Sequence, residues 1–278
     1  MSLQFYLHAD TTNPKAVKAV KFLTDKYENS MASIEKADVI ITLGGDGTTL
    51  DALRLGLKHG KKVYGMNLGH VGAYQNKFDI QNLPERIEQA SEVQLHPLTA
   101  KAIKLDDCVI QAEAWNEIYV RSGDNPQQAR LVGRVDGWKM PFCVCGDGYL
   151  LATPLGSLAY NLAAGGHKLH FREKLLASTA IAACRGVNDI LPDHSHIHLE
   201  VKDPVKRCVS LVADNRLMGK VKSCDIFQYF SRSVTLLWDS EKIQQVEDKG
   251  LQTLKERLPF VSKALQTNGY YHNQYLRA

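Results

Sequence analysis

The sequence has no apolar run long enough to cross a bilayer and no strong excess of one charge. A membrane-spanning helix needs about 20 apolar residues, and the longest candidate, 175–184, is interrupted by Ser178 and Thr179. The N-terminus lacks a basic segment followed by an apolar one, so no secretory signal is expected. A net charge of +4 suits anionic small molecules and does not predict a nucleic-acid partner. We therefore expect a cytoplasmic protein without a membrane or nucleic-acid partner.

Patterns that would indicate a disulfide framework or a metal centre are also missing. The 278 residues contain six cysteines and no C-x-x-C motif, which does not suggest a stapled fold. Cys143 and Cys145 lie in an apolar run and are expected to be buried free thiols. His194, His196 and His198 alternate along the chain, which we interpret as one face of a surface strand rather than a zinc site. No metal ligand is predicted in the chain.

The first third of the sequence alternates between strand and helix patterns. Asn13 and Pro14 are typical of a helix start. Residues 38–43 form a β-branched run that predicts a strand, and leucines at helical spacing then lead to Gly60. Residues 62–66 predict the next strand. The order strand, helix, strand predicts an α/β domain with a parallel sheet.

The pattern changes near Pro97, after which strand signals dominate as far as residue 239. Asp136-Gly137 predicts a two-residue hairpin turn between strands 130–135 and 139–144. Further strands are expected at 208–214 and 233–238. Residues 157–185 are expected to be mostly helical, and another helix is expected after Ser240.

The sharpest local motif is Gly44-Gly45-Asp46-Gly47-Thr48, which follows the strand at 38–43. Glycines let a backbone approach phosphates closely, and the start of the next helix favours negative charge. A carboxylate beside phosphates is useful if it removes a proton from an attacking hydroxyl or holds Mg²⁺. A simple chain reversal would also explain Gly-Asp-Gly.

Two common nucleotide-binding motifs do not fit this loop. Leu50 stands where the dinucleotide fingerprint has Gly or Ala, and no Gly-Lys-Ser/Thr follows. A phosphate loop without a lysine must obtain positive charge from a metal or from elsewhere in the fold.

Three further segments carry possible ligand contacts. A second glycine turn runs from Asn67 to Gly72 after the next strand, so both turns should lie at the same edge of the sheet. Asn116-Glu117 offers amide and carboxylate groups that could bind ribose hydroxyls. The stretch from Gly146 to Gly166 concentrates small and polar residues around a Thr-Pro turn, which suits a flat ligand such as a purine.

Taken in order, these four segments resemble the NAD kinase family, also called ATP-NAD or polyphosphate-NAD kinases, of the bacterial type. The resemblance implies an α/β N-terminal domain with a parallel sheet, a β-rich C-terminal domain, and a C-terminal segment that returns to the first domain. We accordingly predict a phosphate-donor domain of residues 1–97 and 240–278 and a dinucleotide-binding domain of residues 98–239.

The resemblance also implies a reaction and its residues. A phosphoryl group would pass from ATP, or polyphosphate, to the adenosine-ribose 2′-hydroxyl of NAD, giving NADP, with Mg²⁺ or another divalent cation accompanying ATP. Asp46 would be the catalytic base. The other residues implied to contact the donor phosphates or the dinucleotide are Gly44, Gly45, Gly47, Thr48, Asn67, Asn116, Glu117, Asp147, Leu158, Ala159, Tyr160, Asn161, Ala163 and Asp214. The family further implies a homodimer or homotetramer.

The sequence departs from the family pattern mainly where the dinucleotide would bind. Ala73 replaces a Phe, Leu158 a Thr, Ala163 a Ser, Cys145 a basic residue and Asn215 a Gly. Two alternatives therefore stay open: a non-catalytic dinucleotide-binding regulator, and a lipid or sugar kinase that shares only the GGDG loop. The sequence does not distinguish ATP from polyphosphate or NAD from NADH.

Overall fold

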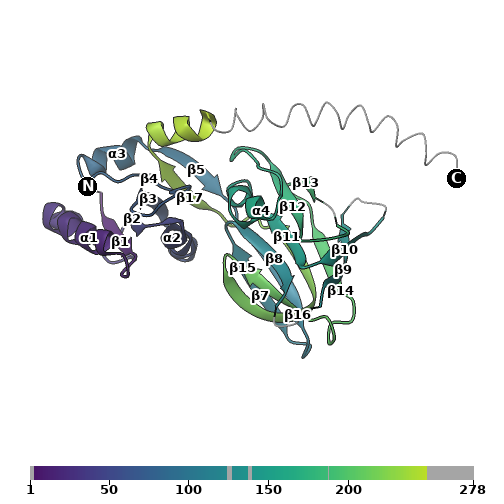
Figure 1. Ribbon diagram of the computed structural model, residues 1–278. Coiled ribbons are helices and arrows are strands. Elements are labelled where there is room, and N and C mark those ends of the chain that lie inside the picture. The colour runs from purple at the N-terminus through teal and green to yellow at the C-terminus, as the bar shows by residue number, and fades with distance from the viewer. Residues whose placement is uncertain (1–2, 124–126, 137–139, 187, 249–278) are drawn as a thin grey trace.

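The computed structural model describes residues 3–123, 127–136, 140–186 and 188–248, which form two domains side by side (Figure 1). The first contains a mainly parallel sheet with helices, and the second is built almost entirely of antiparallel strands. The predicted combination of an α/β domain and a β-rich domain is confirmed. No helix within the described ranges is long and apolar enough to cross a membrane.

The first sheet has the strand order β1-β2-β3-β17-β5, and β4 also pairs with β3. Strands β1, β2, β3 and β17 run parallel to one another, whereas the edge strand β5 runs antiparallel to β17. The residue bounds are β1 (Phe5–Ala9), β2 (Val39–Gly44), β3 (Lys62–Asn67), β4 (Asn76–Lys77), β5 (Ser91–Leu95) and β17 (Val234–Trp238). Every residue of β2 is buried, as expected for a strand with both faces covered.

The start of the first helix at Asn13-Pro14 and the end of the second helix at Gly60 lie where the sequence predicts. The side chain of Asn13 accepts a hydrogen bond from the N–H of Lys15 at the start of α1 (Pro14–Lys26). Helix α2 (Asp46–His59) starts directly after β2 and ends at Gly60, whose φ of 64° suits a left-handed C-cap. The remaining labelled helical elements are η1 (Glu28–Ser30) and α3 (Leu83–Gln89).

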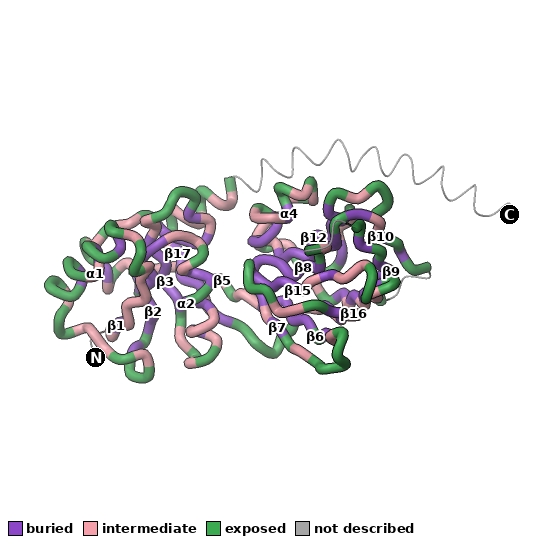
Figure 2. The backbone as a smooth tube through the Cα atoms, turned by 60° about the horizontal axis from the view of Figure 1, so that its bottom comes forward, coloured by how far each residue is buried: buried purple, intermediate pink, exposed green. Residues whose placement is uncertain are grey.

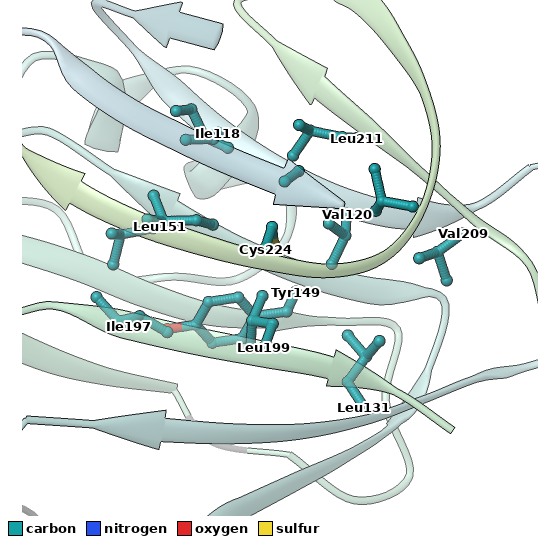
Figure 3. Close-up of a cluster of buried hydrophobic side chains, with 14 of the residues drawn as sticks. Ile118, Val120, Leu131, Tyr149, Leu151, Ile197, Leu199, Val209, Leu211 and Cys224 are labelled. Atoms are coloured by element: carbon teal, nitrogen blue, oxygen red, sulfur yellow. The ribbon is translucent and has the colours of Figure 1, made fainter. Parts of the chain in front are cut away.

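The second sheet contains eleven strands within the described ranges and curls around an apolar core (Figures 2 and 3). Alternate residues of strands such as β9 point into this core, which gives the period of two expected for a half-buried strand. The strands are β6 (Leu98–Lys104), β7 (Val109–Ala114), β8 (Glu117–Ser122), β9 (Ala129–Val135), β10 (Phe142–Gly146), β11 (Gly148–Ala152), β12 (Leu175–Ile181), β13 (Asn188–Pro192), β14 (Ile197–Val201), β15 (Val209–Ala213) and β16 (Arg216–Gln228).

Two predictions for the β-rich domain are corrected. The hairpin of β9 and β10 is present, but β10 begins at Phe142 rather than at residue 139, so the connection exceeds two residues. Residues 137–139 lie outside the described part. The stretch 157–185 is not mostly helical, because it contains only η2 (Gly156–Leu158) and the four-residue α4 (Tyr160–Ala163) before β12. A short buried apolar run cannot be assigned to helix or strand by periodicity alone.

The chain returns to the first domain earlier than the sequence division placed it. Residues 234–238 were assigned to the β-rich domain, but β17 pairs with β3 and β5 of the first sheet. The reason is that this apolar strand completes the buried centre of the parallel sheet. Residues 240–248 are helical, and Ile243 and Val246 pack against the first domain. The helical positions expected beyond residue 248 lie outside the described residues, and the other domain boundaries stay predictions.

The cysteine prediction was partly wrong. Cys143 is exposed and Cys145 is half-buried, because their neighbours Phe142 and Val144 occupy the inward positions of β10. His198 lies on β14 and His196 directly precedes it, and both contact Asp225. The described residues contain no group of three or more His, Cys, Asp or Glu arranged to hold a metal ion.

Candidate active site

The two glycine turns lie against each other at the carboxyl end of the parallel sheet. The N–H of Leu68 donates to the carbonyl of Gly44 at 2.8 Å. A Cβ at Gly69 would lie 2.8 Å from the Cα of Gly45, so this approach requires glycine. Asn67 fixes its own turn by accepting the N–H of Gly69 at Oδ1, 2.9 Å away. The proximity predicted from the strand order is therefore observed.

Asp46 is the first residue of α2 and stands at the junction of the two turns. Its Oδ1 accepts the backbone N–H of Tyr74 at 3.0 Å, which leaves the second carboxylate oxygen available for other contacts. The side chain is half-buried and lines the cleft between the domains. Gly47 next to it is exposed, and Thr48 follows in the first turn of the helix. A carboxylate held this way can accept a proton from a bound hydroxyl.

The segment after the second turn is hydrogen-bonded to the glycine loop of residues 44–48. Gln75 is 2% exposed, and its Nε2 donates to the carbonyls of Gly44 at 3.0 Å and Gly45 at 3.1 Å. Asn76 donates to the carbonyl of Leu237 in β17 at 3.0 Å. No sequence signal identified these two residues, because their role depends on a loop about 30 residues earlier and a strand far later in the chain.

The β-rich domain presents Asn116 to the opposite side of the cleft. Its backbone N–H donates to Oδ1 of Asp214 at 2.8 Å, and the N–H of Trp115 donates to Oδ2 at the same distance. Arg54 of α2 also donates to Oδ2 at 2.8 Å. The Asp214 side chain is fully buried. Its carboxylate thus holds the backbone of Trp115 and Asn116 in place. Burial raises the pKa of Asp214, while these backbone donors and Arg54 act in the opposite direction.

Glu117, the residue after Asn116, does not line the cleft. It is 2% exposed, and its Oε2 has no hydrogen-bond partner. Burial, and secondarily the charge of Asp214, raises the pKa of Glu117 to about 8. At neutral pH this carboxyl is therefore mainly protonated, and it can donate a hydrogen bond as well as accept one.

The cleft has a volume of about 1080 Å³ and lies between the two domains. It brings together five of the residues predicted from the sequence. These are Asp46, Asn67, Asn116, Leu158 and Ala159. Leu158 and Leu162 are 47% and 40% exposed and form an apolar wall. The other predicted residues of the glycine motif flank Asp46 in the sequence but do not themselves line the cleft. These are Gly44, Gly45, Gly47 and Thr48.

Three predicted residues come after Leu158 and Ala159 in the sequence but do not line the cleft: Tyr160, Asn161 and Ala163. The side chain of Asn161 is occupied within the fold: Nδ2 donates to the carbonyls of Ser157 and His167, and Oδ1 accepts from Thr179. The ring of Tyr160 packs edge-on against Tyr119, with 5.0 Å between centroids. Ala163 is exposed. Their binding roles stay predictions.

Asp147 lies at the other end of β11 from the cleft. Residue 154, which lines the cleft, follows the end of β11, whereas Asp147 precedes its start. A five-residue strand spans about 16 Å. The Asp147 side chain is exposed, and its backbone is fixed by hydrogen bonds with Ile181 and Ser122. Asp147 therefore does not line the cleft of its own chain, and its implied contact with the dinucleotide stays a prediction.

Lys242 supplies a positive charge that the glycine motif lacks. It comes from the returning helix of residues 240–248, and its Nζ donates to the carbonyl of Gly72 at 2.7 Å. The ammonium also lies 5.8 Å from the centre of the Trp238 ring. Because 170 residues separate Lys242 from Gly72, the sequence offered no signal for this pairing.

Comparison with known proteins agrees with this geometry. Residues 3–94 match the family described as ATP-NAD kinase N-terminal domain. An NAD kinase of Hyphomonas neptunium is 42% identical over 230 residues, covering 81% of this chain and 89% of that protein. The chain belongs to the NAD kinase family. A second family member, from Brucella suis biovar 1, is 38% identical over 238 residues, covering 84% of this chain and 91% of the relative.

Two solved structures show that the NAD kinase fold extends over most of the chain. Yeast NADH kinase complexed with NADH superposes with a TM-score of 0.74 at 21% identity, covering 91% of this chain and 88% of its own. An NAD kinase from Archaeoglobus fulgidus in complex with ATP gives 0.68 at 21% identity, covering 90% and 98%.

Proposed function

We propose that this member of the NAD kinase family transfers a phosphoryl group from ATP to the adenosine-ribose 2′-hydroxyl of NAD, giving NADP. The main support is the position of Asp46, which stands where the two glycine turns meet and faces a cleft whose opposite wall carries Asn116. A non-catalytic dinucleotide-binding protein would not need a carboxylate beside phosphates. A lipid or sugar kinase that shares only the GGDG loop would not need Asn116 on the opposite wall of the cleft.

The chain's own residues divide the work between positioning and proton transfer. The glycine backbone at residues 44–47 and the start of α2 favour the donor phosphates, and Lys242 adds positive charge nearby. Asn116 and the apolar wall around Leu158 and Ala159 hold the dinucleotide. Asp46 removes the proton from the 2′-hydroxyl as it attacks the phosphoryl group.

A divalent cation is expected to accompany ATP. Mg²⁺ at nucleotide sites keeps several waters and binds substrate phosphates, so it would be held largely by ATP, and the second oxygen of Asp46 stays available for the proton. When bound, such a cation would neutralise charge on the donor phosphates. We also infer a cytoplasmic homo-oligomer, on the resemblance to the family alone.

Purified full-length protein tests the proposal directly. Incubation with ATP, Mg²⁺ and NAD should yield NADP and ADP in equal amounts by chromatography. Parallel reactions with polyphosphate in place of ATP, and NADH in place of NAD, define the donor and the acceptor. ATP hydrolysis without any phosphorylated dinucleotide would contradict the proposal.

A further inference from the structure

Tyr74 contacts both sides of the cleft at once. Its backbone N–H donates to Oδ1 of Asp46 at 3.0 Å, and its hydroxyl donates to Oδ1 of Asn116. Asp46 belongs to the donor side and Asn116 to the acceptor side of the proposed reaction. One residue therefore connects the proposed base with the proposed dinucleotide contact.

Tyr74 is held rigidly in this position. It is 2% exposed, and its carbonyl accepts the indole N–H of Trp238 at 2.9 Å. The side chain of the next residue, Gln75, donates a hydrogen bond to the carbonyl of Gly44, and the side chain of Asn76 donates one to β17. The phenol ring packs in the apolar cluster that contains Trp115, Leu155 and Trp238. The hydroxyl therefore cannot move without disturbing this cluster.

The direction of the hydrogen bond follows from the charge state of the phenol. Burial raises the pKa of Tyr74 well above its ordinary value, and the neighbouring charges of Asp214, Glu117 and Asp46 raise it further. The phenol thus stays protonated and can donate. Asn116 meets it with the amide oxygen, so the amide nitrogen of Asn116 points away from Tyr74.

The backbone of Asn116 is fixed as well. Its N–H donates to Asp214 at 2.8 Å, and its carbonyl accepts the N–H of Thr153 at 2.9 Å. With the backbone anchored on both sides, the orientation of the Asn116 amide is set by its contact with Tyr74.

We propose that Tyr74 is a positioning residue for the acceptor: its hydroxyl turns the Asn116 amide so that the Nδ2 hydrogens face acceptor atoms of the dinucleotide. Suitable atoms are a ring nitrogen of the base or an oxygen of the ribose or phosphate. This inference rests on the proposed function for the identity of the ligand. It adds two points to that function: Asn116 donates hydrogen bonds to the dinucleotide, and Tyr74 fixes the orientation in which it does so.

Tyr74→Phe removes the hydroxyl and keeps the ring, its packing and the backbone N–H to Asp46. The KM for NAD should rise about five- to tenfold, as expected for the loss of one orienting hydrogen bond. The KM for ATP and kcat should stay within about twofold of wild type, because the contact with Asp46 comes from the backbone. An unchanged KM for NAD in an active enzyme would overturn the inference.

Tyr149→Phe is the matched control. It also removes a buried phenol hydroxyl, which is 2.8 Å from Ser178 Oγ in the core of the β-rich domain. We expect it to lower the melting temperature without changing the KM for NAD. If both tyrosine variants raise the KM equally, the effect of Tyr74 is general destabilisation and the inference is wrong.

A double variant tests whether Tyr74 acts through Asn116. In an Asn116→Ala background, Tyr74→Phe should add no further increase in the KM for NAD. An equal increase in both backgrounds would show that Tyr74 acts independently of Asn116. Asn116→Asp adds a second test, since it keeps an acceptor for Tyr74 but loses the Nδ2 donors; unchanged NAD binding by this variant would overturn the assigned polarity.

Calorimetry separates this inference from the proposed function. If the wild-type protein forms no NADP, the function fails, but NAD affinities of the same variants still test the role of Tyr74. If it forms NADP and Tyr74→Phe binds NAD as wild type does, only the inference fails.

Discussion

Arg54 of α2 and Asp214 of the β-rich domain form an ion pair across the domain boundary, with 2.8 Å between Nη2 and Oδ2. The Asp214 side chain is completely buried, and the Arg54 side chain is 24% exposed. The same carboxylate anchors Trp115 and Asn116. The pair therefore joins the helix that begins with Asp46 to the loop that carries Asn116.

Removing the cation of this pair should destabilise the protein. Arg54→Met leaves the buried Asp214 carboxylate without its guanidinium partner, which costs on the order of 3 kcal/mol when a buried pair is broken. Lys62→Met provides the control, because the Lys62–Glu92 pair is about half exposed on both sides and should cost less than about 1 kcal/mol. Urea unfolding of both variants measures the difference, and equal losses would contradict the structural role of Arg54.

The buried carboxyl of Glu117 predicts a pH dependence of stability. Its pKa is raised from 4.5 to about 8 in the folded protein, mainly by burial. Between these values the folded state holds a proton that the unfolded state has released, so stability falls as pH rises from about 4.5 to about 8. The slope for one proton is at most about 1.4 kcal/mol per pH unit.

Glu117→Gln tests this by removing the titrating group while keeping its shape. The variant should lose less stability than wild type between pH 5 and pH 8 in parallel urea titrations. Identical pH profiles for the two proteins would show that Glu117 is ionised throughout this range.

Parts of this fold are readable from the sequence because local rules agree with the tertiary structure. The cap at Asn13, the C-terminal Gly60 and the buried strand ending at Gly44 each carry a strong local signal, and all three appear as predicted. The meeting of the two glycine turns also follows, since parallel strands end at one edge of a sheet.

Other parts depend on contacts that no local pattern encodes. Residues 175–181 were taken as helix because a buried strand and a buried helix can have the same apolar composition. The link from Tyr74 to Asn116 joins two domains, and Lys242 reaches Gly72 from the far end of the sequence. Asp147 follows an apolar strand, as a cleft residue would, yet it stands at the wrong end of β11.

The exposed position of Asp147 leads to a prediction about assembly. If this residue contacts the dinucleotide, it does so in the cleft of another copy of the chain. We expect a homodimer or larger assembly, and Asp147→Ala should raise the KM for NAD about tenfold, since it removes a charged hydrogen-bond partner. Light scattering that returns the 31.0 kDa monomer mass, together with an unchanged KM, would contradict both expectations.

Asp46→Asn gives the most direct test of the central claim, that Asp46 is the base that activates the acceptor hydroxyl. The variant keeps the side-chain shape and an oxygen that can accept the Tyr74 N–H, but it cannot take up the proton. Single-turnover formation of NADP should slow about 10²- to 10⁴-fold, while the affinity for NAD measured by calorimetry stays close to wild type. An Asp46→Asn protein that forms NADP at nearly the wild-type rate would contradict the account.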